Sequence, residues 1–287
     1  MAVDSEPSFT ALTAAAARAA HLIVDQPPYI FSDTAAAAIL GEMAAGLIRY
    51  HQENPSHPIL ATARGQVLCR SRCAEDYLAA AVAAGVRQYV VLGAGLDTFA
   101  CRSRLAGQLS IWEVDHPATQ AWKRGALAAA QIDAGPDTTF IPAEFGSGSL
   151  ARALRAGGFD FGQAAVISWL GVTLYLDDHA IRDTLSALAG CAPGTELIVD
   201  YMLPAGLRDV AADSYASQVG AAAADRGEPW LTFASPADMT ALLAEYGFAI
   251  AGHVRQRDAI PAELWDRSDA LRPVELSVIA RATRQAR

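Results

Sequence analysis

An apolar run from Gln88 to Leu92 leads directly into a turn that contains Gly93 and Gly95, and this junction constrains the fold more than any other feature. A valine-rich run of this length is typical of a buried β-strand, and the glycines allow a tight turn that a ligand can approach closely. Asp115 follows Gly95 by 20 residues and ends the next apolar run. A carboxylate at this distance can accept hydrogen bonds from ribose hydroxyls. The pattern therefore predicts an adenosine lying across the ends of two neighbouring strands.

Two other interpretations of the glycine turn stay open at this point. Two glycines after a strand can form a turn that binds nothing, although the carboxylate of Asp115 argues against this. The turn also resembles the dinucleotide fingerprint of nicotinamide-dependent oxidoreductases, whose third glycine would fall where the chain has Thr98. In addition, the strand begins only after more than 80 residues. Both departures disfavour a nicotinamide cofactor.

The chain after Gly85 alternates short β-branched runs with helical stretches, which is the pattern of βαβ units and a mainly parallel sheet. The predicted strands cover residues 88–92, 109–114, 138–141, 164–169, 196–201, 248–253 and 274–280. The last two runs lack a long crossover helix between them, so we expect the final strand to enter as part of an antiparallel pair. The predicted fold class is α/β, Rossmann-like, with a mixed, mainly parallel seven-stranded sheet.

The first part of the chain, residues 1–84, is predicted to form a helical cap. Apolar residues recur there at helical spacing over residues 11–24, 33–51 and 64–84, and prolines separate the three stretches. Residues 85–287 are predicted to form the Rossmann-like domain. We expect its segment 202–233 to be partly helical and to cover the substrate.

Composition narrows the classes of partner. The net charge of −9 disfavours nucleic acid and anionic membrane surfaces. No stretch reaches the ~20 apolar residues of a membrane span, and the first ten residues lack the pattern of a secretory signal. The four cysteines show no metal-ligand spacing, so no metal site is expected, and free thiols fit a reducing compartment. We therefore expect a cytoplasmic protein that acts on a small molecule.

Four segments of the chain carry characteristic motifs: residues 70–72 (Arg-Ser-Arg), 92–98 (Leu-Gly-Ala-Gly-Leu-Asp-Thr), 112–117 (Trp-Glu-Val-Asp-His-Pro) and 169–176 (Trp-Leu-Gly-Val-Thr-Leu-Tyr-Leu). Taken in order, these segments resemble the leucine carboxyl methyltransferase family. The family includes enzymes that methylate protein phosphatases and bacterial O-methyltransferases of natural products. The resemblance implies a class I methyltransferase fold, S-adenosyl-L-methionine as cofactor, and an O-methyltransferase activity.

The resemblance also implies roles for individual residues in binding the cofactor. Arg70 would pair with the methionine carboxylate, for which the guanidinium fork is well suited. Gly93 would approach the methionyl part, and Asp115 would hold the ribose. Glu144 and Phe145 would flank the adenine, although relatives commonly have aspartate at the first of these positions.

Three further residues of the matched segments are expected to contact the cofactor: Gly95, Asp97 and Trp169. Relatives often carry glutamate where this chain has Leu170. This difference removes one polar contact near the amino group of the cofactor and leaves that interaction to backbone carbonyls or to a neighbouring residue.

The nature of the methyl acceptor stays open between two chemistries. A carboxylate is the first choice, because better-known members of the family methylate carboxyl groups and because a carboxylate is already ionised at pH 7. A phenol or alcohol would need a general base. The candidates near the reaction are Tyr175, His179 and Tyr201, with the two tyrosines expected to line the pocket, and Trp230 is expected to meet the substrate. A protein that binds the cofactor without turnover is a further alternative.

Overall fold

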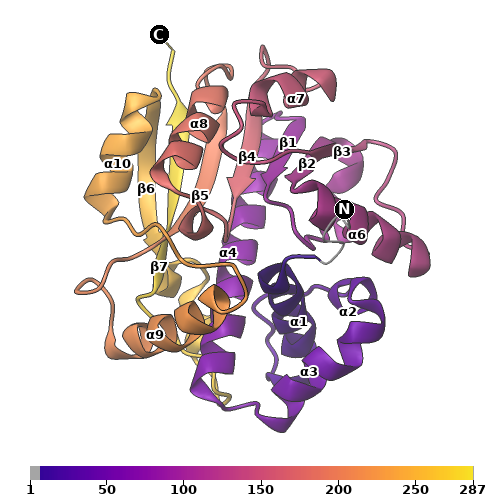
Figure 1. Ribbon diagram of the computed structural model, residues 1–287, viewed down its shortest axis with the longest axis vertical. Helices are drawn as coiled ribbons and strands as arrows, with labels where there is room; N and C mark the ends of the chain where they lie inside the picture. The colour runs from indigo at the N-terminus through magenta and orange to yellow at the C-terminus, as the bar shows by residue number, and fades with distance from the viewer. Residues whose placement is uncertain (1–6, 287) are drawn as a thin grey trace.

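The structure is a computed structural model that describes residues 7–286. Residues 1–6, on which part of the predicted cap and of the expectation about a secretory signal depends, lie outside it, as does Arg287. One seven-stranded sheet runs through the molecule in the order β3-β2-β1-β4-β5-β7-β6 (Figure 1). All neighbouring strands are parallel except β7, which pairs antiparallel with both β5 and β6. The predicted fold class is confirmed.

The strands lie close to the predicted runs. Their bounds are β1 Gln88–Leu92, β2 Ser110–Asp115, β3 Thr138–Pro142, β4 Ala165–Trp169, β5 Glu196–Met202, β6 Phe248–Arg255 and β7 Ser277–Arg284. The helices are α1 Phe9–Val24, α2 Ala36–Ile39, α3 Ala44–Glu53, α4 Pro58–Ala83, α5 Phe99–Arg102, α6 Pro117–Ala129, α7 Leu150–Ala156, α8 Asp178–Leu188, α9 Val210–Ala224 and α10 Pro236–Glu245. Within residues 7–286, no helix is long and apolar enough to span a membrane.

Both faces of the sheet are covered because the strands are apolar on both sides. In β1, Val90 and Leu92 belong to the core that also contains buried side chains of α7, α8 and α10. Tyr89 and Val91 point to the opposite core, which α4 and α5 complete. Sheets buried on both faces read as continuous apolar runs, so this packing explains why the strands were recognisable in the sequence.

The single helix predicted over residues 33–51 is wrong. The chain forms α2, a short 3₁₀ turn over Gly41–Met43, and then α3. Gly41 has φ +55, a left-handed conformation that a continuous α-helix does not contain. The helical structure also begins later than predicted, because the Asp33 carboxylate accepts hydrogen bonds from the backbone N–H groups of Ala35 and Ala36.

The third predicted helix begins six residues earlier than expected, at Pro58 instead of Arg64. Proline favours the first turn of a helix, where its missing N–H is not needed. The resulting helix α4 has 26 residues and is long enough to contact both α1 and the sheet. It contacts α1, and buried side chains from both of its halves, among them Leu68 and Leu78, belong to the core that also contains Tyr89 and Val91 of the sheet. The proposed boundary at residue 84 stays a prediction.

A polar network lies inside the N-terminal helices. Arg64, which is fully buried, donates two hydrogen bonds of 2.9 Å to the Asp25 carboxylate. His21 also contacts Asp25, through Nδ1 at 2.9 Å, while its Nε2 accepts from the Ile30 N–H, so the proton of the neutral ring is on Nδ1. His51 lies 3.3 Å from Arg64, and burial together with this guanidinium lowers the pKa of His51 to about 4.

Candidate active site

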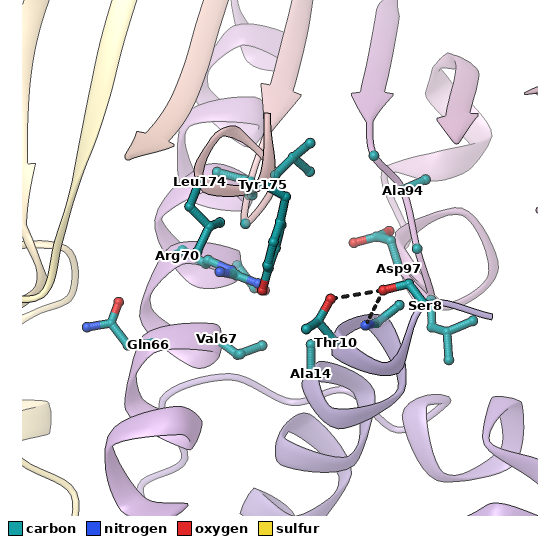
Figure 2. A pocket seen from close by; sticks show the side chains of 18 of the residues that line it. Ser8, Thr10, Ala14, Gln66, Val67, Arg70, Ala94, Asp97, Leu174 and Tyr175 are labelled. Atoms are coloured by element: carbon teal, nitrogen blue, oxygen red, sulfur yellow. Dashed lines mark hydrogen bonds between the residues drawn. The ribbon is translucent and has the colours of Figure 1, made fainter. Parts of the chain in front are cut away.

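A cavity of about 330 Å³ lies at the carboxyl edge of the parallel strands, between the sheet and helices α1 and α4 (Figure 2). Its walls come from the start of α1, the middle of α4, the turn after β1, the loop after β4 and the segment around α9. Open α/β sheets bind ligands at this edge, where successive connections diverge to opposite faces. The fold thus gathers residues from distant parts of the sequence around one space.

The turn after β1 lines the cavity. The backbone N–H groups of Gly93 and Ala94 both donate to the Val114 carbonyl, at 2.8 and 3.0 Å, which ties the turn to the end of β2. Gly93 has φ +66, and a Cβ atom there would lie only 2.3 Å from Cγ2 of Val172. Glycine is therefore required both for the backbone conformation and for the close approach of the loop after β4.

Asp115 ends β2 with its carboxylate fixed beside this turn. One oxygen accepts a 2.5 Å hydrogen bond from the Gly95 N–H, and the other accepts from the His116 N–H at 2.7 Å. Burial raises the pKa of Asp115, and these two backbone donors oppose the shift. The spacing of 20 residues read from the sequence corresponds to a direct contact in the structure.

Arg70 projects from α4 to the loop after β4. Its Nη1 lies 3.4 Å from the carboxylate of Asp200 on β5, and that carboxylate also accepts a 2.5 Å hydrogen bond from the Gly171 N–H. Gly171 has φ +71, and a Cβ atom there would lie 2.4 Å from Arg70 Nη2. Burial raises the pKa of Asp200, and Arg70 opposes this shift. Asp200 thus positions Arg70 at the cavity wall.

Asp97 faces Arg70 across the cavity. Figure 2 shows its carboxylate pointing from the glycine turn into the space that separates it from Arg70 and Tyr175. One oxygen of Asp97 accepts a 2.7 Å hydrogen bond from the Phe99 N–H. Glu75, a second acidic residue at the wall, is instead paired with Arg102. The polar lobe of the cavity, defined here as Arg70, Gly93, Gly95, Asp97 and Asp115, therefore presents a cation and an anion on opposite sides.

Seven of the residues predicted to bind cofactor or to take part in the reaction line this cavity: Arg70, Gly93, Gly95, Asp97, Asp115, Phe145 and Tyr175. Four others do not line it: Glu144, Trp169, His179 and Tyr201. No bound ligand tests their roles, so the assignments stay predictions, but the surroundings of these four residues differ.

Glu144 is exposed at the rim, with its carboxylate 3.7 Å from Nε2 of His116, which does line the cavity. Trp169 packs in the core on the other face of β4, 6.3 Å from the ring of Phe145, and its indole N–H is buried without a partner among residues 7–286. Trp169 thus packs near the Phe145 ring from the core and does not itself line the cavity.

The other two candidates lie farther from the polar lobe. Tyr201 belongs to the core on the face of the sheet opposite α4, and its hydroxyl lies 2.9 Å from Nδ1 of His253. His179, in the first turn of α8, lies beside Gly146. Of the three residues proposed near the reaction, the structure places only Tyr175 at the cavity wall.

The second part of the cavity is apolar. This apolar lobe is defined by Leu174, Met202, Tyr215, Trp230 and Leu276, which form one cluster together with α9. Tyr175 and Gln66 also line the cavity. Burial raises the pKa of both Tyr175 and Tyr215, so their hydroxyls are neutral at pH 7.

The sequence did not reveal how the apolar lobe is closed. The backbone N–H of Thr10 donates to Glu228 at 3.1 Å, and the Arg226 guanidinium lies 4.3 Å above the ring of Phe9. Farther along, the Leu231 N–H donates to the Leu174 carbonyl at 2.6 Å. The start of α1 and the segment after α9 therefore close over the same space.

The chain is similar to a known protein family and to individual proteins. The model of the leucine carboxyl methyltransferase family matches residues 11–189. A Bacillus subtilis protein, YktD, described as a candidate S-adenosyl-L-methionine-dependent methyltransferase, is 28% identical over 94% of this chain and 96% of its own length. A protein of Mycolicibacterium gilvum with the same description is 34% identical over 64% of this chain and 70% of its own length.

Two solved structures share the fold at low sequence identity. A candidate methyltransferase from Thermobifida fusca has a TM-score of 0.60 at 17% identity, over 99% of this chain and 97% of its own. A DUF574 family protein from Streptomyces avermitilis has a TM-score of 0.59 at 18% identity, over 93% and 96% of the two chains. These two likenesses concern the fold alone.

Proposed function

The chain belongs to the leucine carboxyl methyltransferase family of S-adenosyl-L-methionine-dependent methyltransferases. From this premise we propose that it methylates an oxygen atom of a small-molecule acceptor, and that this oxygen belongs to a carboxylate. The observation that carries the proposal is the pairing of a charged polar lobe with an apolar lobe in one cavity. The polar lobe suits the cofactor, and the apolar lobe suits the body of an acceptor.

The polar lobe fits S-adenosyl-L-methionine group by group. The amino-acid end of the cofactor is a zwitterion, and the lobe offers Arg70 for the carboxylate and Asp97 for the ammonium. Asp97 would take the contact that relatives make with a glutamate at the position of Leu170. Asp115 stands where it can accept from ribose hydroxyls, and Phe145 offers an aromatic face to the adenine.

Methyl transfer needs alignment more than catalytic groups. When bound, the cofactor supplies an electrophilic methyl group, to which an acceptor oxygen forms a bond as the methyl–sulfur bond breaks and its electron pair moves to sulfur. The protein holds the reactants in line, and such positioning contributes up to about 7–11 kcal/mol to lowering a barrier. The walls of the two lobes can provide this by fixing the cofactor and the acceptor in one cavity.

A carboxylate acceptor is favoured by what the apolar lobe contains. The histidine and the acids that line the cavity, His116, Glu75, Asp97 and Asp115, are not members of its cluster. The raised pKa values of Tyr175 and Tyr215 make their hydroxyls unsuitable as general bases at pH 7. A carboxylate gives up no proton in the reaction, whereas a phenol or an alcohol must lose one. The alternative of a hydroxyl acceptor would require a base from outside this lobe.

Calorimetric titration tests the proposal at the level of the cofactor. S-adenosylhomocysteine should bind to the wild-type protein, and NAD should not. Binding of NAD with no binding of S-adenosylhomocysteine would instead support an oxidoreductase. Binding without methyl transfer to any acceptor would support a protein that holds the cofactor without turnover.

A further inference from the structure

Two buried N–H groups at the cavity wall have no hydrogen-bond partner among residues 7–286. They are Nε2 of Gln66 on α4 and Nε1 of Trp230 in the segment after α9. Buried donors are nearly always paired in folded proteins, and leaving one unpaired costs about 1–3 kcal/mol. Unpaired donors at the wall of a binding cavity therefore point to a ligand that supplies the missing acceptors.

The Gln66 side chain is tied to the sheet. Its Oε1 accepts a 2.7 Å hydrogen bond from the hydroxyl of Ser277 at the start of β7. In this arrangement the hydroxyl is the donor and the amide oxygen is the acceptor. The Gln66 side chain is buried, with the residue only 7% exposed, and its NH₂ group is left to donate. In this arrangement the amide therefore has a donor to offer.

Trp230 is equally constrained. Its indole packs against the ring of Tyr215 at 6.3 Å and lies beside Gly220, where a Cβ atom would be 3.6 Å from the indole. The next residue, Leu231, is tied to the Leu174 carbonyl. An indole N–H can only donate. The hydroxyl of Tyr175 faces it, but no hydrogen bond of normal geometry joins the two groups. Trp230 therefore also has a donor to offer to an acceptor atom.

The remaining surface of the apolar lobe selects an apolar molecule. Leu174, Met202 and Leu276 contribute aliphatic or thioether surface, and Tyr215 and Trp230 contribute aromatic surface. The basic and acidic residues that line the cavity, Arg18, Arg70, Glu75, Asp97, Asp115 and His116, are not members of this cluster, so a second ionic group on the ligand would meet no charge within it. A polar or multiply charged acceptor would therefore lose its hydration without compensation.

We propose that the methyl acceptor is an apolar monocarboxylic acid whose carboxylate is bound by Gln66 Nε2 and Trp230 Nε1. This inference rests on the proposed function and narrows its substrate class. One carboxylate oxygen accepts from these donors, while the other oxygen forms the new bond to the methyl carbon and the sulfur keeps the electron pair of the broken bond. No proton is transferred, and the acid becomes a neutral methyl ester.

Binding of model acids to the protein loaded with S-adenosylhomocysteine tests the inference without turnover. Phenylacetate represents aromatic acids, octanoate represents aliphatic acids, and succinate is the polar control. We expect phenylacetate or octanoate to bind and succinate to bind at least about tenfold more weakly, because the lobe offers nothing to its second charge. Equal binding of succinate, or no binding of either apolar acid, would overturn the inference.

Substitutions at the two donors give a second, independent readout. Trp230→Phe keeps the aromatic packing and removes only the N–H, and Gln66→Leu removes the amide. Each substitution should weaken the binding of the acid that the wild-type protein binds about three- to tenfold, because one hydrogen bond is lost. Neither should change the affinity for S-adenosylhomocysteine. Unchanged affinity for the acid in both variants would refute the assignment of the donors.

Gln256→Leu is the matched control. Gln256 is a second buried glutamine with an unpaired Nε2, and it does not line the cavity. Its replacement creates the same kind of defect in the core but should leave binding of both ligands unchanged. If the wild-type protein fails to bind S-adenosylhomocysteine at all, the proposed function fails; if it binds this ligand normally and discriminates poorly among the acids, only the inference fails.

Discussion

Replacement of Arg70 by alanine tests the assignment of the cofactor's amino-acid end. Arg70 is partly buried, with its side chain 20% exposed, and lies 3.4 Å from an Asp200 side chain that is 5% exposed. A charged hydrogen bond in such surroundings contributes a binding free energy between the small contribution of a surface ion pair and the larger contribution of a fully buried pair. We therefore expect S-adenosylhomocysteine to bind about 30- to 150-fold more weakly, or about 2–3 kcal/mol.

The variant also affects the protein itself, because it leaves the buried Asp200 carboxylate without the Arg70 cation beside it, while the Gly171 N–H continues to donate to it. Calorimetry should therefore compare S-adenosylhomocysteine with 5′-methylthioadenosine, which has the same nucleoside but lacks the amino-acid end. The ratio of the two affinities cancels effects on folding.

Arg70→Lys, which keeps the charge and loses the guanidinium fork, should give an intermediate loss. Equal losses for the two ligands would refute a direct contact with the carboxylate, and so would an affinity for S-adenosylhomocysteine within twofold of wild type.

The remaining predictions concern three other residues. Asp97→Asn should weaken the binding of S-adenosylhomocysteine about tenfold or more and leave the binding of 5′-methylthioadenosine, which has no ammonium group, unchanged. Equal effects on the two affinities would exclude a contact between Asp97 and the ammonium. Asp115→Ala should weaken both ligands in calorimetry, because both contain the ribose, and an effect on only one would show that the adenosine is misplaced. His51 has a folded pKa of about 4, below its usual value of 6.5, so the unfolded chain binds a proton first as the pH falls and stability is lost between pH 6.5 and 4, by about 3 kcal/mol. Urea unfolding of His51→Gln, which keeps an acceptor for Arg64, should show a smaller loss over this pH range, and an identical loss would contradict the shift.

The sequence predicted most of the fold because the strands are buried on both faces and leave continuous apolar runs. The helical segment was harder, since the start of α2 depends on the Asp33 side chain and its separation from α3 depends on the left-handed conformation of Gly41. Apolar periodicity carries no information on either feature. The early start of α4 was missed because Pro58 was interpreted as a break instead of a first-turn residue.

The polar lobe was more predictable than the apolar lobe. Its residues lie in short motifs whose spacing reflects local geometry, as the contact between Gly95 and Asp115 shows. Asp200 had one weak signal, an acid inside an apolar run. The pairing of Gln66 with Ser277 had none, because these residues are 211 positions apart and meet only when α4 packs against β7.

Base treatment of the methylated product tests the central claim of carboxyl methylation most directly. The protein would be incubated with S-adenosyl-L-methionine labelled in its methyl group and with a panel of apolar monocarboxylic acids, including phenylacetate and octanoate. Methyl esters hydrolyse in mild base and release methanol, whereas methyl ethers and N-methyl groups survive. We expect transfer of label to at least one acid and its release as volatile methanol. Label that stays with the product after base, or no transfer to any acid, would contradict the account.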